Sequence, residues 1–178
     1  VPNGVDLERF SPERRAPGRR LLAERLGIDL DRPVAGFVAH NFRLKGLREA
    51  LDALAATRPA LRWQLVVAGG DRPAPFLRAA GARGLAADVR FAGTARDPEH
   101  YLAAADVLLY PTHYDPCANV VPEALASGIP VITTRQNGAS ELVEHDATGW
   151  IVASPGDTGA MADALLALAT EPGRRDRM

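Results

Sequence analysis

The chain has 178 residues, of which 47% are hydrophobic and 24% charged, as is typical of one globular domain. Its net charge of −1 argues against a nucleic-acid partner, which normally requires an excess of basic residues. The single cysteine, Cys117, cannot form an internal disulfide and fits a reducing compartment. The sequence has no apolar run as long as a membrane span. Because Val1 is not a natural start, we expect a fragment of a longer protein.

The pattern of apolar residues predicts that strands and helices alternate along the chain. Residues 1–18, which are rich in proline, glycine and charge, are expected to form a linker that leads into the domain. Strands are expected at Val34–Ala39, Trp63–Ala68, Val89–Ala92, Val107–Tyr110, Pro130–Thr134 and Gly149–Ala153. Helices are expected at Arg19–Leu26, Gly46–Ala56, Ala74–Arg83, Pro98–Ala105, Asn119–Ser127, Ala139–Glu144 and Thr158–Thr170, the last capped by Asp157.

This alternation predicts an α/β fold with a doubly wound, Rossmann-like parallel sheet. Most of the expected strands are continuous apolar runs, as in sheets whose two faces are both covered by helices. Ligands in such folds bind beyond the carboxyl ends of the strands. The loops that follow four of the strands meet at that edge, so we expect convergence of Arg43, Lys45, Gly70, Thr94, Asp115 and Glu123.

The most informative segment runs from Tyr110 to Thr134 as strand, loop, helix and strand. Asp115 lies in the loop and Glu123 lies just inside the helix, with seven residues between them. Ala118, Asn119 and Val120 fall where the helix begins, and a helix N-terminus binds anions through its free N–H groups and dipole. Two hydrogen-bond acceptors that flank an anion site suit a nucleotide sugar, which carries hydroxyl groups on both sides of its phosphates.

Other signals are weaker or absent. All of the 21 basic residues except Lys45 are arginine, which fits either codon bias or a site that needs a compact ammonium group. The sequence has no dinucleotide fingerprint, P-loop or GxSxG motif, and its four histidines show no metal-ligand spacing, so no metal site is expected. The pattern Asp29-Leu30-Asp31 is interpreted as turn chemistry. Taken alone, Glu123 could simply stabilise a helix, and Asp115 could be a turn residue.

Taken together, these residues resemble a known family over nearly the whole chain. The match includes the opening segment Val1–Asp6, the pair Lys45-Gly46, the two acids Asp115 and Glu123, the run EALASGIPVI from Glu123 to Ile132, and Gly149. The chain is similar to the C-terminal half of the retaining glycosyltransferases of family 4, which have the GT-B fold. Its sequence FRLKG also resembles the lipopolysaccharide-core glucosyltransferase subgroup.

The resemblance implies a role for each matched position. Lys45 and Arg43 would bind the donor diphosphate and stabilise it as it leaves. The backbone of Ala118, Asn119 and Val120 would bind the distal phosphate, Glu123 the ribose, Asp115 the donor sugar, and Gly93 and Thr94 would lie beside the base. Asp115, Arg43 and Lys45 would thus be the catalytic residues. The chain departs from the family at Asp115, where glutamate is usual, and at His40, where an arginine is frequent.

The resemblance therefore implies a donor domain for retaining hexosyl transfer to a glycan or lipopolysaccharide acceptor. The substrate would be a UDP- or GDP-linked sugar, with no cofactor or metal. The N-terminal acceptor domain would be missing, so the fragment should bind nucleotide without transferring sugar. The location would be cytoplasmic, with any contact to the inner membrane made through the missing half. A non-catalytic binding module and a sugar-nucleotide epimerase are the alternatives.

Overall fold

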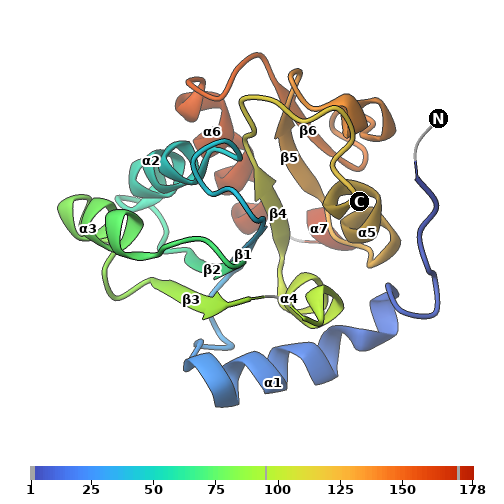
Figure 1. The fold of residues 1–178 in the computed structure, drawn as a ribbon, viewed down its shortest axis with the longest axis horizontal. Helices are drawn as coiled ribbons and strands as arrows, with labels where there is room; N and C mark the ends of the chain where they lie inside the picture. Colours follow the sequence, from blue (N-terminus) through green and yellow to red (C-terminus); the bar gives the residue numbers. More distant parts are fainter. Residues whose placement is uncertain (1–2, 95, 172) are drawn as a thin grey trace.

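The computed structural model describes residues 3–94, 96–171 and 173–178, apart from the side chains of residues 175 and 176. Its centre is a parallel sheet of six strands (Figure 1). The strands are β1 (Val34–Val38), β2 (Gln64–Ala68), β3 (Val89–Gly93), β4 (Val107–Tyr110), β5 (Val131–Thr134) and β6 (Gly149–Val152). All six coincide with expected strands to within one residue at each end, and the expected α/β fold class is confirmed.

The strand order is β3-β2-β1-β4-β5-β6, so the chain winds in one direction from β1 and then restarts on its other side at β4. β1 pairs with β2 along its whole length and with β4 through Ala35 opposite Val107 and Gly36 opposite Leu108. The loops that leave β1 and β4 diverge to opposite faces of the sheet. This divergence creates a crevice at the carboxyl ends of the two central strands, where doubly wound folds bind their ligands.

Helices cover both faces of the sheet (Figure 1). One face is covered by α2 (Leu47–Thr57), α3 (Ala74–Ala82) and α6 (Thr158–Thr170), and α2 packs on α6. The other face is covered by α1 (Arg15–Leu26), α4 (Pro98–Ala104) and α5 (Val120–Ala126), and α1 packs along α4. Short elements complete the described chain: the 3-10 turns η1 (Pro12–Arg14) and η2 (Gly138–Leu142), and the helix α7 (Arg174–Arg177).

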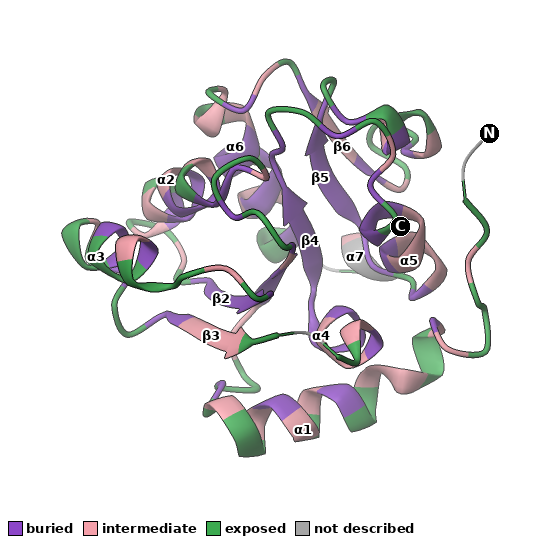
Figure 2. Cartoon of the chain, in the orientation of Figure 1, coloured by how far each residue is buried: buried purple, intermediate pink, exposed green. Residues whose placement is uncertain are grey.

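The core fills both interfaces between the sheet and the helices. The central strands are buried on both faces (Figure 2), which explains their continuous apolar sequences. Phe42 extends this core into the loop that follows β1. Its ring packs edge-on against Phe37 and Phe76, at centroid distances of 6.0 and 5.6 Å. The loop beyond β1 is therefore fixed by core packing and not only by its own turns.

Three sequence expectations differ from the structure. Helix α1 begins at Arg15, so the final residues of the expected linker are helical. Proline and glycine favoured a linker here, but proline is tolerated in the first turn of a helix, and Gly18 permits close packing on α4. The segment expected to be a helix at Ala139–Glu144 is the 3-10 turn η2. Asp157 precedes α6, but its side chain makes no capping hydrogen bond.

None of the helices in the described ranges is both long and apolar enough to cross a lipid bilayer.

Candidate functional site

A cavity of about 360 Å³ lies at the crevice between the carboxyl ends of β1 and β4. Its walls come from the ends of the three central strands β1, β2 and β4, from the loops beyond them and from the first turn of α5. Six of the residues expected at the site line this cavity: Lys45, Asp115, Ala118, Asn119, Val120 and Glu123. Segments up to 78 positions apart along the sequence therefore meet at one place.

The cation of the site, Lys45, is held against the loop beyond β4. Its Nζ donates to Asp115 Oδ2 at 2.7 Å and to the Tyr114 carbonyl at 3.2 Å. The next residue, Gly46, has a φ of 81°, and a Cβ there would lie only 2.0 Å from the Pro111 carbonyl oxygen. Glycine is thus required where the two loops touch, and this close approach brings the ammonium group to the acid.

Asp115 is a buried carboxylate surrounded by donors. Besides Lys45, the Tyr110 hydroxyl donates to its Oδ2 at 3.2 Å, and the Cys117 N–H donates to its Oδ1 at 3.1 Å. Burial, followed by the negative charge of Asp115 and the hydrogen bond to it, raises the pKa of Tyr110, so the phenol remains a donor. A carboxylate has about four lone-pair positions, so roughly one remains for a ligand.

Next to Asp115, the start of α5 presents free backbone donors to the cavity. The N–H groups of Ala118, Asn119 and Val120 have no acceptor within the described part of the chain. Ala118 and Val120 are buried, so water has little access to these residues. The side chain of Asn119 accepts a hydrogen bond from Asn3 Nδ2 at 2.8 Å. These N–H groups can hydrogen-bond oxygen atoms of an anion.

Glu123 places a second carboxylate on the cavity wall. It is half-buried, and its side chain has no hydrogen bond to any residue that the structure describes. Burial raises the pKa of Glu123; the nearby Arg9 acts in the opposite direction, and Glu99 adds to the rise. Arg9 itself is paired with Glu99 at 2.9 Å. A half-buried carboxylate without a donor is costly, and its desolvation is relieved when a ligand supplies hydroxyl groups.

Three of the residues expected to converge do not line this cavity, namely Arg43, Gly70 and Thr94, and neither does Gly93, which was expected beside the base. Arg43 precedes Lys45 by two residues in a tight turn and lines a neighbouring cavity instead. Arg43 and Lys45 thus line two neighbouring cavities, and their joint role toward the donor diphosphate stays a prediction. Gly93 and Thr94 lie at the end of β3, which is separated from β1 by β2. The adjacent Gly69 takes the place of Gly70 in the cavity wall.

The structure adds residues to the site that the sequence did not suggest, among them Tyr110 and Pro98. Tyr110 was expected only as the last residue of a strand, and Pro98 only as the first residue of a helix. Both line the cavity, and Tyr110 contacts Asp115 directly. The available signal was a hydroxyl-bearing aromatic residue at the carboxyl end of a central strand, five residues before an acid. His40, which stands where the family frequently has arginine, also lines the cavity.

The part of the chain that the structure describes has no cluster of three or more histidine, cysteine or acidic side chains that could hold a metal ion. In the Asp29-Leu30-Asp31 segment, Asp29 Oδ1 accepts a hydrogen bond from the Asp31 N–H at 3.0 Å. This interaction confirms the interpretation of the segment as turn chemistry.

Comparison with known proteins identifies relatives of this chain. A family model described as "Glycosyl transferases group 1" matches residues 32–171. The lipopolysaccharide glucosyltransferase WaaG of Escherichia coli K12 is 29% identical over 157 residues, which cover 87% of this chain and 42% of WaaG. A D-inositol 3-phosphate glycosyltransferase of Saccharomonospora viridis is 35% identical over 185 residues, which cover 97% of this chain and 42% of that protein.

The same relationship appears in three dimensions. The crystal structure of WaaG matches 98% of this chain with a TM-score of 0.87 and 27% identity, using 48% of the WaaG chain. The present chain thus spans less than half the length of these relatives. Its fold is that of one half of a GT-B enzyme, as expected.

Proposed function

Because the chain belongs to the group 1 glycosyl transferases, we propose that it is the donor-binding half of a retaining hexosyltransferase that uses a nucleotide diphosphate sugar. The observation that carries this proposal is the cavity in the crevice between β1 and β4. It brings together one ammonium group, three free backbone N–H groups and two carboxylates. A diphosphate between two polyols needs this combination of donors and acceptors.

The donor diphosphate would lie between Lys45 and the start of α5. Lys45 and the N–H groups of Ala118, Asn119 and Val120 would carry its negative charge. That charge increases on the leaving diphosphate as the glycosidic bond breaks, so the same groups would also stabilise the transition state. Arg43 lines the neighbouring cavity, so the proposal does not depend on its contribution to diphosphate binding.

The two carboxylates would bind the hydroxyl groups on either side. No described residue donates a hydrogen bond to the Glu123 carboxylate, so it would be able to accept hydrogen bonds from the ribose hydroxyl groups. Asp115 would accept from the donor sugar through its remaining lone pair. The base would extend toward the end of β3, where Gly93 and Thr94 lie. The remaining half of the protein would supply the rest of the acceptor site, and similarity to WaaG, a lipopolysaccharide glucosyltransferase, supports a glycan or lipopolysaccharide acceptor.

Calorimetry tests donor binding most simply. Titrating the chain with UDP, GDP, ADP and the corresponding nucleotide sugars should show binding of one nucleotide series. Lys45→Ala should weaken that binding by roughly 10–100-fold, because it removes a charge-assisted contact worth about 1.5–3 kcal/mol. Arg20→Ala removes a positive charge from the exposed surface of α1 and should bind like the unchanged chain. If none of the nucleotides binds, the proposal is wrong.

A second function, a non-catalytic nucleotide-binding module, is favoured by one observation. Lys45, Tyr110 and Cys117 already occupy most of the hydrogen-bonding capacity of Asp115. Transfer or hydrolysis of the donor by the complete protein, lost in Glu123→Ala, would exclude this alternative. The chain by itself is expected to bind nucleotide without transferring sugar.

A further inference from the structure

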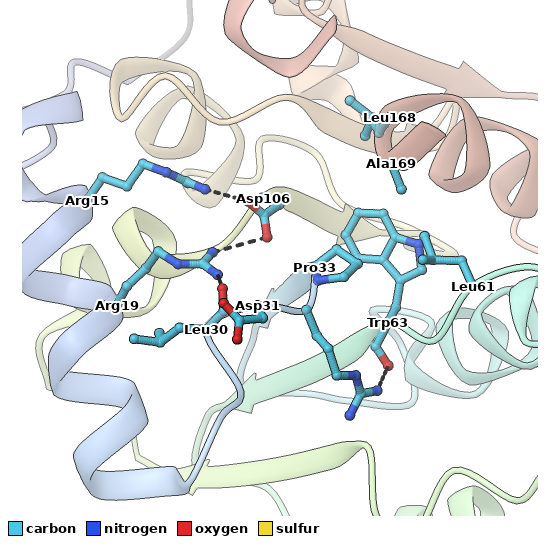
Figure 3. A pocket seen from close by; sticks show the side chains of 11 residues that line it. Arg15, Arg19, Leu30, Asp31, Pro33, Leu61, Trp63, Asp106, Leu168 and Ala169 are labelled. Carbon is cyan, nitrogen blue, oxygen red and sulfur yellow. Dashed lines mark hydrogen bonds and ion pairs between the residues drawn. The ribbon is translucent and has the colours of Figure 1, made fainter. Parts of the chain in front are cut away.

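Two cavities besides the donor cavity are lined by three arginines each, and the two sets differ in their partners. The first cavity, of about 490 Å³, lies at the amino-terminal edge of the sheet (Figure 3). Arg15 and Arg19 reach from α1 to the buried Asp106, and Arg32 binds Asp88 at 2.7 Å. All three also donate to backbone carbonyl groups. These guanidinium groups are engaged in contacts within the fold, with their charges matched by buried carboxylates.

The second cavity, of about 640 Å³, lies at the opposite edge of the sheet, and its arginines are not paired. It is lined by Arg43, Arg48 and Arg72. Within the described ranges, none of these three guanidinium groups forms a hydrogen bond or an ion pair. Arg48 makes a cation–π contact instead, with its guanidinium carbon 5.8 Å from the centre of the Phe76 ring. Three exposed arginines thus line one cavity without forming an ion pair among the described residues.

The two acids that line this second cavity make their close contacts with groups other than the three arginines. Glu49 Oε1 lies 3.1 Å from His113 Nε2. Asp71 accepts the backbone N–H of Phe42 at 3.0 Å and that of Arg72 at 2.7 Å. Asp71 thereby holds the loop beyond β1 in place. Three arginines against two acids leave the cavity with a net charge of +1, and the guanidinium groups have no acceptor among the described residues.

The second cavity shares a wall with the donor cavity. The loop beyond β1 separates them, with Lys45 lining the donor cavity and Arg43 lining the other. Across this wall, the N–H of His113 donates to the Leu44 carbonyl at 2.9 Å, which fixes the loop beyond β4 in the same position. A molecule bound by the arginines would therefore lie beside the donor, at the edge of the sheet where ligands of this fold bind.

We propose that Arg43, Arg48 and Arg72 form a second anion site, which binds the phosphate monoester group of an acceptor while the donor occupies the neighbouring cavity. Guanidinium groups suit this ligand because their planar fork of N–H donors matches phosphate oxygens two at a time. The role of the anion as part of an acceptor rests on the proposed function. Binding of the phosphate group itself does not.

Nuclear magnetic resonance of the arginine side chains tests this site in the 178-residue chain. The titration uses Lys45→Ala as background, which removes the donor-site cation, and the probes are inorganic phosphate, glucose 6-phosphate and glucose. The Nε–H signals of Arg43, Arg48 and Arg72 should shift saturably with phosphate and with glucose 6-phosphate, but not with glucose. Equal shifts of all exposed arginines, or binding of inorganic phosphate without the ester, would overturn the proposal.

Substitutions provide the matched control. Replacing both Arg48 and Arg72 by alanine should weaken phosphate binding by about tenfold or more, since each lost charge-assisted contact contributes on this scale. Arg78→Ala removes an exposed arginine of α3 that has no partner among the described residues and lies outside the cavity, so it should change nothing. Unchanged phosphate binding in the double variant would contradict the site. Titration of the unsubstituted chain with nucleotides is a separate experiment. If no nucleotide binds, the proposed donor function is wrong, but the proposed phosphate site is not affected.

Discussion

At the scale of single residues, the state of Asp115 determines how the donor cavity works. Its carboxylate is the counter-ion of Lys45, at 2.7 Å, and both side chains are largely shielded from solvent, with exposed fractions of 11% and 16%. A diphosphate would compete with Asp115 for the same ammonium group. The shorter side chain at this position therefore keeps the acid close to Lys45 and limits what it can offer to a sugar.

Asp115→Asn separates the role of Asp115 as counter-ion of Lys45 from its role as an acceptor for the donor sugar. Because the amide carries no charge, Lys45 is released to the ligand, and affinity for a nucleoside diphosphate should rise or stay unchanged. The affinity that the nucleotide sugar gains over the nucleoside diphosphate should fall, since an amide accepts hydrogen bonds from the sugar hydroxyl groups less strongly than a carboxylate. Calorimetry with UDP and UDP-glucose, or with the corresponding pair of the preferred nucleotide, measures both quantities. If the substitution weakens the two ligands equally, Asp115 has no separate role toward the sugar.

Glu123 links nucleotide binding to stability. Burial raises the pKa of Glu123 in the folded protein, so its ionised form opposes folding above that pKa, and the cost disappears as the pH falls toward the unfolded-state pKa. Glu123→Gln should therefore raise the melting temperature at pH 7, and the gain should shrink toward pH 4. Thermal unfolding across this range measures the difference.

The control for this effect is Glu24→Gln, at an exposed position of α1, which should leave the melting temperature unchanged. The same Glu123→Gln variant should bind nucleotide less tightly, because an amide accepts ribose hydroxyl groups less strongly than a carboxylate does. If Glu123→Gln instead lowered the melting temperature at pH 7, burial of the ionised carboxylate would not cost stability as proposed.

At the scale of elements, the site depends on the contact between the loops that follow β1 and β4. Gly46 makes this contact possible, and its left-handed backbone and the close Pro111 carbonyl leave no space for a side chain. Gly46→Ala should reduce the free energy of unfolding by about 2 kcal/mol or more. It should also weaken nucleotide binding by displacing Lys45. Chemical denaturation and calorimetry measure the two effects.

Gly81→Ala is the matched comparison for this substitution. Gly81 lies in α3, where a Cβ would meet nothing within 4 Å, and alanine favours a helix. This change should increase stability by roughly 0.4–1 kcal/mol and leave nucleotide binding unaltered. If the two glycine substitutions had similar effects, the contact at Gly46 would not support the site as described.

The elements also show where sequence patterns suffice and where they do not. The strands were predictable because burial on both faces imposes continuous apolar runs such as QLVVA in β2. The start of α1 was not, because Arg15 is held in the helix by contacts with Ala105 and Asp106, about 90 positions away. Likewise, the missing cap at Asp157 depends on local backbone geometry that residue identity alone does not fix.

At the scale of the whole molecule, alternation along the sequence predicted the sheet and the edge that carries the site, but not the order of its strands. That order places β1 and β4 side by side and makes the crevice between them the cavity. It also explains why Lys45 and Asp115 meet while Thr94, on the far side of β2, lies apart. The separation of Arg43 from Lys45 depends on the direction of side chains in a tight turn, which spacing alone could not reveal.

The central claim is that a nucleotide sugar binds in the crevice at the carboxyl ends of β1 and β4. Backbone amide resonances followed during titration with the preferred nucleotide sugar test it most directly. We expect the largest changes at the free N–H groups of Ala118, Asn119 and Val120, with smaller changes around Lys45 and Glu123. Changes concentrated instead at the amino-terminal edge of the sheet, around Arg19 and Trp63, or no saturable change at all, would contradict the account.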